Sequence, residues 1–376
     1  MIALVYGTTA ELIKLAPIHR RLEALGATPL HWCTAQQYDE LPEAARLLGM
    51  PEPDIWLARG ANDHSLRTTV DALRWLATIS TTAMSKRKLM RQQLAQDGAQ
   101  PCILVHGDTM TTVLGALLGR TLRVPVAHVE AGLRSHDWRH PFPEELDRRF
   151  VGRLAHIHYA PGLTEAANLG GRNRDVVLTN GNTVRDSMLL VPSQLDPDVA
   201  DLPDVFGLVS LHRLELLQDE RFAESLRALR ASAEATPLVM VYDPVTDEQI
   251  DKQGLGDLFD GVHFRRIPKL PYFRFVALLR RADFVVTDSG GLQEECAFLG
   301  KPCLVHRVKT ERSDGLGASV RLSGMRVVEL NRFLGNRDLF QTEQSPQSTS
   351  PSAIIVEDLV RRGMVCGHVS LTATDH

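Results

Sequence analysis

Short apolar runs alternate along the first half of the chain with longer stretches of helical period. The apolar runs predict strands at residues 2–6, 29–33, 103–105 and 126–129. The periodic stretches predict helices at residues 11–25, 65–96, 109–122 and 143–154. This alternation of strand and helix is typical of a parallel sheet that is covered by helices on both faces.

The same rhythm restarts after about residue 190. Strands are predicted at residues 207–211, 238–242, 262–264, 284–287 and 303–306, and helices at 219–234, 271–281 and 291–299. A Pro- and Asp-rich segment, residues 193–204, has little that could pack and is interpreted as a linker. The polar segment 341–352 is interpreted as a mobile loop.

The pattern therefore predicts an α/β fold of two doubly wound, Rossmann-like domains that face a central cleft. Their predicted boundaries are residues 1–192 and 193–376, and the last helical segment is a candidate to pack back onto the first domain. Ligands of such sheets bind beyond the carboxyl ends of the strands, so polar residues at those ends are the candidates for chemistry.

Composition narrows the class of protein. The length of 376 residues exceeds one ordinary core, and a net charge of −4 gives no global attraction to nucleic acid or to an anionic membrane. No apolar run is long enough to span a membrane, and the first six residues lack the basic segment of a signal peptide. Five scattered cysteines without zinc spacing predict free thiols in a cytoplasmic protein and no metal site.

Residues 7–11 (GTTAE) form the turn after the first predicted strand. A glycine there would let a ligand approach the backbone, and the following helix would offer free N–H groups to a phosphate. Lys14, one turn into the helix, could reach the same anion. The alternative is an ordinary turn followed by a solvated lysine.

Carboxylates follow the next two strands. Asp108 is either the N-cap of the next helix or a catalytic carboxylate. Glu130 closes a very apolar strand, where desolvation would raise its pKa and suit acid–base work, unless it forms a salt bridge to Arg134. Glu144 suits the positive end of a predicted helix, which explains it without function, yet carboxylates from separate segments could converge as acid and base.

The second half holds two further candidate segments. His212 follows the first strand there and could hold a diphosphate, move a proton, or be structural. Ser289, Gly290 and Gly291 give a strand-to-helix turn with a hydroxyl, a permissive backbone and free N–H groups, which favours phosphate binding. Glu295, one turn later, could accept both hydroxyls of a ribose.

Several long motifs occur together in residues 1–330. They are VHGDTMTT, HVEAGLRS, PFPEELDRR, TNGNTVRDS and TDSGGLQEECAFLGKP, followed by TER at Thr310 to Arg312. On these motifs the chain resembles the non-hydrolysing UDP-N-acetylglucosamine 2-epimerases, which have the two-domain fold of the glycosyltransferase-B type. The resemblance implies elimination of UDP from a UDP-linked N-acetylhexosamine to give a 2-acetamidoglucal, and re-addition after inversion at C2.

The resemblance also implies roles for residues. Asp108, Glu130 and Glu144 match the proposed catalytic carboxylates, and His212 is implicated in catalysis. Ser289, Gly290 and Gly291 match the diphosphate site and Glu295 the ribose contact. Further candidates for binding the substrate are Thr9, Lys14, Arg134, Arg213, Phe275 and Arg312. The family needs neither metal nor nicotinamide cofactor, and its members are often homodimers.

The chain departs from the family at the nucleotide and sugar contacts. Thr9 and Ala10 replace an Arg-Pro pair, Leu214 and Leu216 replace an arginine and an amide, and the tail after about residue 330 does not match. Alternatives to an epimerase are therefore a hydrolase that releases free amino sugar and nucleotide, a sugar transferase, and a nucleotide-sugar-binding protein without turnover.

Overall fold

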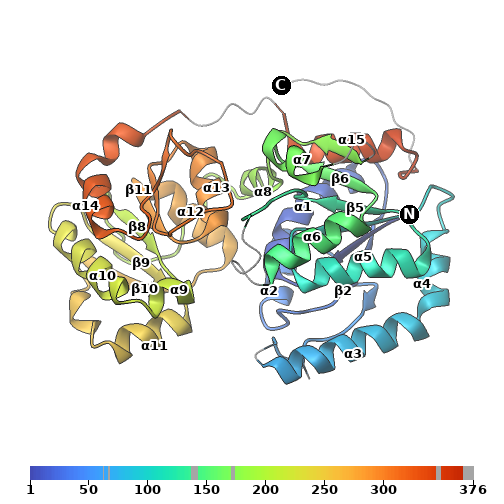
Figure 1. The fold of residues 1–376 in the computed structure, drawn as a ribbon, viewed down its shortest axis with the longest axis horizontal. Helices are drawn as coiled ribbons and strands as arrows, with labels where there is room; N and C mark the ends of the chain where they lie inside the picture. The colour runs from blue at the N-terminus through green and yellow to red at the C-terminus, as the bar shows by residue number, and fades with distance from the viewer. Residues whose placement is uncertain (62, 67, 137–142, 171–173, 344–348, 367–376) are drawn as a thin grey trace. The chain divides into compact units, whose positions relative to one another are not determined.

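The structure is a computed structural model that describes residues 1–61, 63–66, 68–136, 143–170, 174–343 and 349–366. The chain divides into two compact units (Figure 1). The first unit contains residues 1–190 together with residues 348–376, and the second unit contains residues 191–347.

The first unit is built on a seven-stranded parallel sheet with the order β3-β2-β1-β4-β5-β6-β7. Its strands are β1 (Ile2–Tyr6), β2 (Leu30–Cys33), β3 (Ile55–Trp56), β4 (Cys102–His106), β5 (Val126–Val129), β6 (Ile157–Ala160) and β7 (Asp175–Leu178). The helices of this unit are α1 (Thr9–Ala24), α2 (Leu41–Leu48), α3 (Thr69–Ser85), α4 (Arg87–Leu94), α5 (Met110–Leu122), α6 (Glu144–Leu154), α7 (Leu163–Leu169), α8 (Val184–Leu189) and α15 (Pro351–Arg361).

The second unit is built on a six-stranded parallel sheet with the order β10-β9-β8-β11-β12-β13. Its strands are β8 (Gly207–Ser210), β9 (Leu238–Tyr242), β10 (Phe264–Pro268), β11 (Phe284–Thr287), β12 (Cys303–Val305) and β13 (Val320–Leu322). Its α-helices are α9 (Leu214–Leu217), α10 (Glu220–Ala233), α11 (Pro244–Lys252), α12 (Tyr272–Arg281), α13 (Gly290–Leu299) and α14 (Val327–Asn336). The predicted α/β class with two parallel sheets is thus confirmed.

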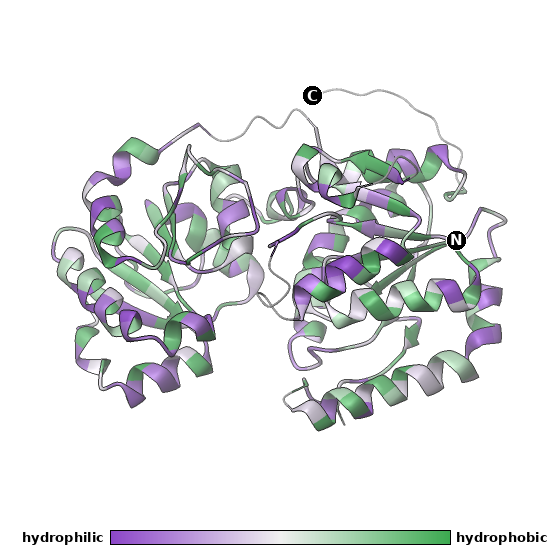
Figure 2. Cartoon of the chain, viewed as in Figure 1, coloured by the Kyte–Doolittle hydropathy of each residue, from purple (hydrophilic) through white to green (hydrophobic). Residues whose placement is uncertain are grey.

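The apolar strands explain why both sheets are covered by helices. In the first unit β1, β4 and β5 are buried along their whole length, as strands covered on both faces must be. Figure 2 shows the strands mostly in green, whereas the helices mix green and purple residues. From β1 the chain runs through α1 outward to β2, and from β4 it runs through α5 in the other direction to β5. Right-handed crossovers therefore put α1 and α5 on opposite faces of the sheet.

Helix α15 returns from the far end of the sequence to the first unit. The Asp186 carboxylate accepts the Ser352 N–H at 2.7 Å, and the buried Asp358 accepts the Tyr159 hydroxyl at 3.0 Å. Arg362 bonds Asp175 at the start of β7, at 2.8 Å from Nη2 to Oδ1. These contacts join α15 to three separate segments of the first unit.

Several sequence predictions of elements were wrong in detail. The predicted helix 65–96 is two helices, α3 and α4, separated at Lys86. The strand predicted at 262–264 is β10 and begins only at Phe264, because the Asp260 carboxylate accepts the N–H groups of Val262, His263 and Phe264 in a turn. The strands and α-helices missed altogether are α2, β3, β6, α7, β7, α8, α9, α11, β13 and α14.

The two predicted irregular segments also differ from expectation. Residues 193–204 carry contacts from arginines of the second unit, since Arg265 donates to the carbonyl of Ala200 at 2.9 Å and Arg274 pairs with Asp198. In the predicted loop 341–352, Pro351 and Ser352 already belong to α15, and residues 344–348 lie outside the described part. Among the described helices, none is long and apolar enough to cross a membrane.

Candidate active site

Each sheet reverses its strand order at one place, and the candidate residues gather there. In the first unit the reversal lies between the paired strands β1 and β4, and in the second between β8 and β11. Segments that follow two adjacent strands must come together at the carboxyl edge of the sheet, which is where such folds bind ligands. The first unit so joins the turn after Tyr6 to the turn after His106, and the second joins His212 to Asp288.

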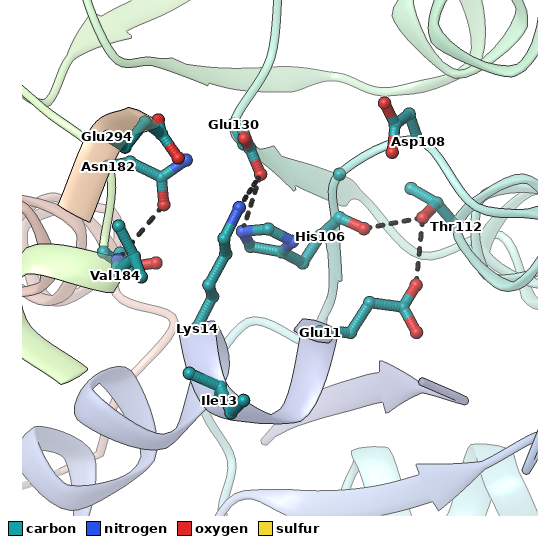
Figure 3. A network of polar contacts seen from close by, with 12 residues as sticks. Glu11, Ile13, Lys14, His106, Asp108, Thr112, Glu130, Asn182, Val184 and Glu294 are labelled. Carbon is teal, nitrogen blue, oxygen red and sulfur yellow. Dashed lines mark hydrogen bonds and ion pairs between the residues drawn. The ribbon is translucent and has the colours of Figure 1, made fainter. Parts of the chain in front are cut away.

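Glu130 is the centre of the arrangement in the first unit (Figure 3). Its side chain is buried, and its carboxylate lies 2.8 Å from the Lys14 ammonium and 3.2 Å from Nε2 of His106. Its φ of +63° is in the left-handed region, an uncommon conformation that costs free energy for a residue other than glycine. The backbone therefore turns sharply after β5 and holds this carboxylate against Lys14 and His106.

Two structural alternatives for this group do not describe the contacts found. Lys14 is not a solvated lysine, because its ammonium bonds the Glu130 carboxylate. The alternative ion pair between Glu130 and Arg134 is replaced by the Lys14 pair, while Arg134 donates from Nη1 to the carbonyl of Leu133 at 2.7 Å.

His128, on β5, fixes the turn after β4 that contains Gly107. Its Nε2 lies 2.7 Å from the carbonyl of Gly107, and burial lowers the pKa of this imidazole to about 4. A neutral His128 can donate one hydrogen bond to that carbonyl and so fixes Gly107, whose φ is +74°. His128 is thus a structural part of the site.

The turn after β1 was expected to offer free N–H groups to a phosphate, but the N–H groups of Gly7, Thr8 and Thr9 are bonded within the chain. The fully buried Glu11 accepts the N–H groups of Gly7 and Thr8 at 2.8 and 2.9 Å, and the N–H of Thr9 is bound by Gln37. Gly7 is required by packing, because a Cβ there would lie 2.0 Å from the Thr34 hydroxyl. A capping box between Thr8 and Glu11 therefore fills the place that was predicted for a phosphate.

Asp108 does not cap α5, which was the structural alternative. Thr109 is the N-cap, since its hydroxyl accepts the N–H of Thr112. The Asp108 carboxylate instead receives two bonds from Arg148 of α6, at 2.7 Å from Nε and 2.6 Å from Nη2. Arg148 was not among the predicted site residues, although it follows Glu144 by four positions on the same helix.

Three acidic residues of α6 have different roles. Glu145 is fully buried and accepts the Ser135 N–H at 2.9 Å and Nε of Arg149 at 2.8 Å, so it is structural. Glu144 and Asp147 lie one turn apart and share the neighbourhood of Asp108. Burial first, and then the charges of Asp108 and Glu144, raise the pKa of Asp147 to about 7. Sequence analysis missed Asp147, although its spacing of three from Glu144 places both on one helix face.

In the second unit, Asp288 fixes His212. The buried carboxylate accepts the N–H groups of His212 and Arg213 at 2.9 and 2.8 Å, and its other oxygen lies 3.2 Å from Nδ1 of His212. A proton on Nδ1 satisfies this contact and leaves Nε2 as the ring nitrogen for a substrate. Asp288 begins the motif that contains Ser289 and was not among the predicted site residues, although its carboxylate holds both the main chain and the ring of His212.

The turn after Asp288 has the features of an anion site. Ser289 caps α13 by accepting the N–H of Leu292, and two glycines open the helix. A Cβ on Gly290 would lie 3.1 Å from Nε of Arg312, whereas a Cβ on Gly291 would meet only the Ser289 hydroxyl, at 3.8 Å. Packing of the chain thus accounts for Gly290, and the open space at Gly291 is suited to a ligand close to the backbone.

Helix α13 also orders the loop that follows β12. Gln293 accepts the Thr310 hydroxyl at 2.7 Å and donates to the carbonyls of Arg312 and Asp314, while Glu294 pairs with Arg312. Arg312 is therefore half of a buried ion pair at this turn.

The two other nucleotide candidates are on α12 and α13. Burial and then the Glu295 carboxylate raise the pKa of the Tyr272 hydroxyl, so these two groups are neighbours. Phe275 is half-buried on α12, the helix that begins with Tyr272. Of the quoted family motif PFPEELDRR, Pro141 and Phe142 lie outside the described residues.

Comparison with known proteins gives a consistent result. Residues 63–329 match the family model described as UDP-N-acetylglucosamine 2-epimerase. A Ralstonia nicotianae protein named a probable UDP-N-acetylglucosamine 2-epimerase is 35% identical over 344 residues, which cover 87% of each chain. The crystal structure of the UDP-GlcNAc 2-epimerase from Neisseria meningitidis, bound to UDP-GlcNAc, has a TM-score of 0.77 and 28% identity, and the match covers 96% of this chain and 99% of that one.

A more distant likeness concerns the fold alone. MurG from Acinetobacter baumannii matches with a TM-score of 0.54 at 15% identity, over 96% of this chain and 98% of that one. Together with the parallel sheets of the two units, this likeness confirms the predicted glycosyltransferase-B type of fold.

Proposed function

Because the chain belongs to the UDP-N-acetylglucosamine 2-epimerase family, we propose that its two reversal-point sites divide the work of that reaction. The enzyme inverts C2 of UDP-N-acetylglucosamine and is an isomerase. The proton chemistry at C2 falls to the first unit, and the diphosphate leaving group falls to the second. The observation that carries the proposal is the buried Glu130 carboxylate held between Lys14 and His106.

In the first unit Glu130 takes the C2 proton. The ammonium 2.8 Å away favours the ionised carboxylate, which is the form that can accept a proton. The C–H electron pair becomes the C1=C2 double bond of a 2-acetamidoglucal, and the C1–O bond breaks with its electrons on UDP. The return step adds UDP to C1 and a proton to C2 on the opposite face. Glu144 and Asp147, which lie on one face of α6, supply that proton. Burial, and then the charges of Asp108 and Glu144, raise the pKa of Asp147 to about 7, so this carboxyl group can hold a proton for C2.

In the second unit the leaving diphosphate is bound at the start of α13. Ser289, Gly290 and Gly291 bring backbone N–H groups to the phosphates, and His212, oriented by Asp288, donates from Nε2 to the departing oxygen. Glu295 holds the ribose, and Arg213, Phe275 and Arg312 complete the nucleotide contacts, while Thr9 and Arg134 contact the sugar side.

We further propose a homodimer that forms through α3. Val70, Leu73 and Met84 are exposed, and no charged residue occurs from Trp75 to Ser85. The hydroxyls of Thr78, Ser80 and Thr81 donate to carbonyls of their own helix, so their protons are bonded within α3. A second copy would bury these exposed apolar side chains about a two-fold axis. The test is sedimentation of the wild type and of Leu73→Glu. A wild-type dimer and a monomeric Leu73→Glu variant would support this pairing, whereas a Leu73→Glu variant that stays a dimer would refute it.

We also propose a cytoplasmic location. All five cysteines are free, four of them buried and Cys366 exposed, which suits a reducing compartment.

The test of the function is proton NMR of the enzyme with UDP-N-acetylglucosamine in heavy water. Deuterium at C2 and a manno product support elimination and re-addition. Appearance of free amino sugar and UDP would instead indicate the hydrolase, which the names of the relatives do not favour. Absence of any change at C2 would refute the proposed reaction on this sugar.

A further inference from the structure

Two adjacent side chains of the first unit, Asn182 and Thr183, are buried without satisfying their polar atoms. They are 3% and 1% exposed. Among the described residues no partner bonds the Asn182 Nδ2 or the Thr183 hydroxyl. A buried donor without a partner destabilises the fold, so two in succession call for a physical reason.

Capping does not explain the asparagine. Its Oδ1 accepts the N–H of Val184 at 3.2 Å and so closes a turn at the start of α8. An aspartate would make that bond equally well and would leave no surplus donor. The amide nitrogen is therefore the part of Asn182 that the local fold does not use.

The position of the pair is fixed against the catalytic residues. Residues 179–183 follow β7 at the carboxyl edge of the sheet, and Asn180 and Gly181 have φ values of +56° and +143°. The Ser187 hydroxyl of α8 donates to the carbonyl of Ile13 at 2.7 Å, one residue before Lys14. Figure 3 draws Asn182, bonded to Val184, together with the Lys14 and Glu130 pair.

We propose that Asn182 and Thr183 bind the 2-acetamido group of the sugar, an assignment that rests on the proposed function. The Asn182 Nδ2 donates to the acetamido carbonyl, and the Thr183 hydroxyl accepts the acetamido N–H. The acetamido nitrogen is bonded to C2. Holding the acetamido group therefore orients the C2–H bond from which Glu130 removes the proton. The pair thus selects an N-acetylated sugar over one with a hydroxyl at C2, because the latter leaves buried groups unpaired.

The experiment compares the binding of UDP-N-acetylglucosamine, UDP-glucose and UDP by calorimetry. The ratio of the two sugar nucleotide affinities is measured in the wild type, in Asn182→Asp and in Thr183→Val. Asp keeps the bond to Val184 and removes the donor. We expect Asn182→Asp to lower the ratio about 10-fold and Thr183→Val about threefold, with the affinity for UDP unchanged.

Ser187→Ala is the control, since Ser187 is buried on α8, the helix that begins after Thr183, and its replacement removes only bonds to the main-chain carbonyls of Ile13 and Thr183. It should lower the melting temperature and leave the ratio intact. An unchanged ratio in a folded Asn182→Asp variant overturns the proposal, as does an equal loss for both sugar nucleotides. A lowered ratio in an enzyme that leaves C2 unexchanged would retain the acetamido site and refute the proposed reaction instead.

Discussion

The points at which the two sheets reverse their strand order have the same topology, but the turns beside them differ in the side chains and N–H groups that they offer to a ligand. In the first unit the turn after β1 is closed by its own Glu11, and the neighbouring residues are paired ions such as Lys14 with Glu130. In the second unit the turn after β11 opens with two glycines, and a single buried Asp288 holds His212. Equal strand order thus does not give equal ligand chemistry.

The difference lies in how each helix start satisfies its N–H groups. Glu11 accepts the N–H groups of Gly7 and Thr8 in a buried capping box, so these two donors are already bonded within the chain. At α13 the Ser289 hydroxyl accepts a single N–H, from Leu292, and Gly291 keeps the backbone approachable. A glycine after a strand therefore favours phosphate binding only where the N–H groups that follow it are not already bonded by a side chain of the same turn, as Glu11 bonds those of Gly7 and Thr8.

The largest effect should come from Glu130→Gln in the first unit. An amide cannot accept the C2 proton, so kcat should fall on the order of 10²–10⁴-fold. The rate of deuterium entry at C2, followed by NMR, measures this loss. Exchange within about fivefold of the wild type would remove Glu130 from the proton chemistry and weaken the division of labour between the units.

Asp288→Asn tests the second unit at a smaller scale. The amide can still accept a backbone N–H, but it does not stabilise a protonated His212, so kcat should fall roughly 10²-fold with KM little changed. A double-mutant cycle with His212→Asn tests the coupling. If kcat falls no further in the double variant than in His212→Asn alone, Asp288 acts through His212. Additive losses would contradict that coupling.

Gly291→Ala separates ligand binding from packing. Its Cβ meets only the Ser289 hydroxyl, so the melting temperature should hold while the Kd for UDP rises about 10-fold. Gly290→Ala is the matched variant, because its Cβ would crowd Arg312 at 3.1 Å and lower the melting temperature. An unaltered Kd in Gly291→Ala would move the diphosphate away from this turn.

The smallest effect is the pH dependence of stability from Asp147. Its pKa is about 7 in the folded protein, chiefly because of burial, against about 4 when unfolded. Its protonated form therefore favours the fold below about pH 4, and that contribution is lost as the pH rises through about 7. Asp147→Asn stays neutral and should melt a few degrees above the wild type at about pH 8 and equally at about pH 4. A constant difference at both pH values would exclude titration of Asp147 as the cause.

The sequence predicted the parallel sheets and most of their strands because buried strands are continuous apolar runs. It missed the short strands β3 and β13, the half-exposed β7, and the buried β6, in which His158 interrupts a short apolar run. It singled out Asp108, Glu130 and Ser289 because polar residues that end apolar strands stand out.

The pairing of these residues could not be predicted, since it depends on contacts across the fold. Arg148 reaches Asp108 from 40 positions away, and Lys14 reaches Glu130 over 116. The positive φ of Glu130 also has no signature in sequence, because glutamate rarely adopts it. The misjudged first turn had a signal, the spacing of Thr8 and Glu11 as a capping box.

The return of α15 has a consequence for how the protein is made. Residues 191–347 are inserted, as one continuous stretch, between two parts of the first unit. The ribosome completes this insert before it synthesises α15, the helix whose Asp358 carboxylate accepts a hydrogen bond from the Tyr159 hydroxyl. Domains that are continuous in sequence fold during synthesis as they emerge. The second unit can thus reach its native state on the nascent chain, whereas the first must wait, with the docking surface for α15 uncovered, until α15 itself has been synthesised.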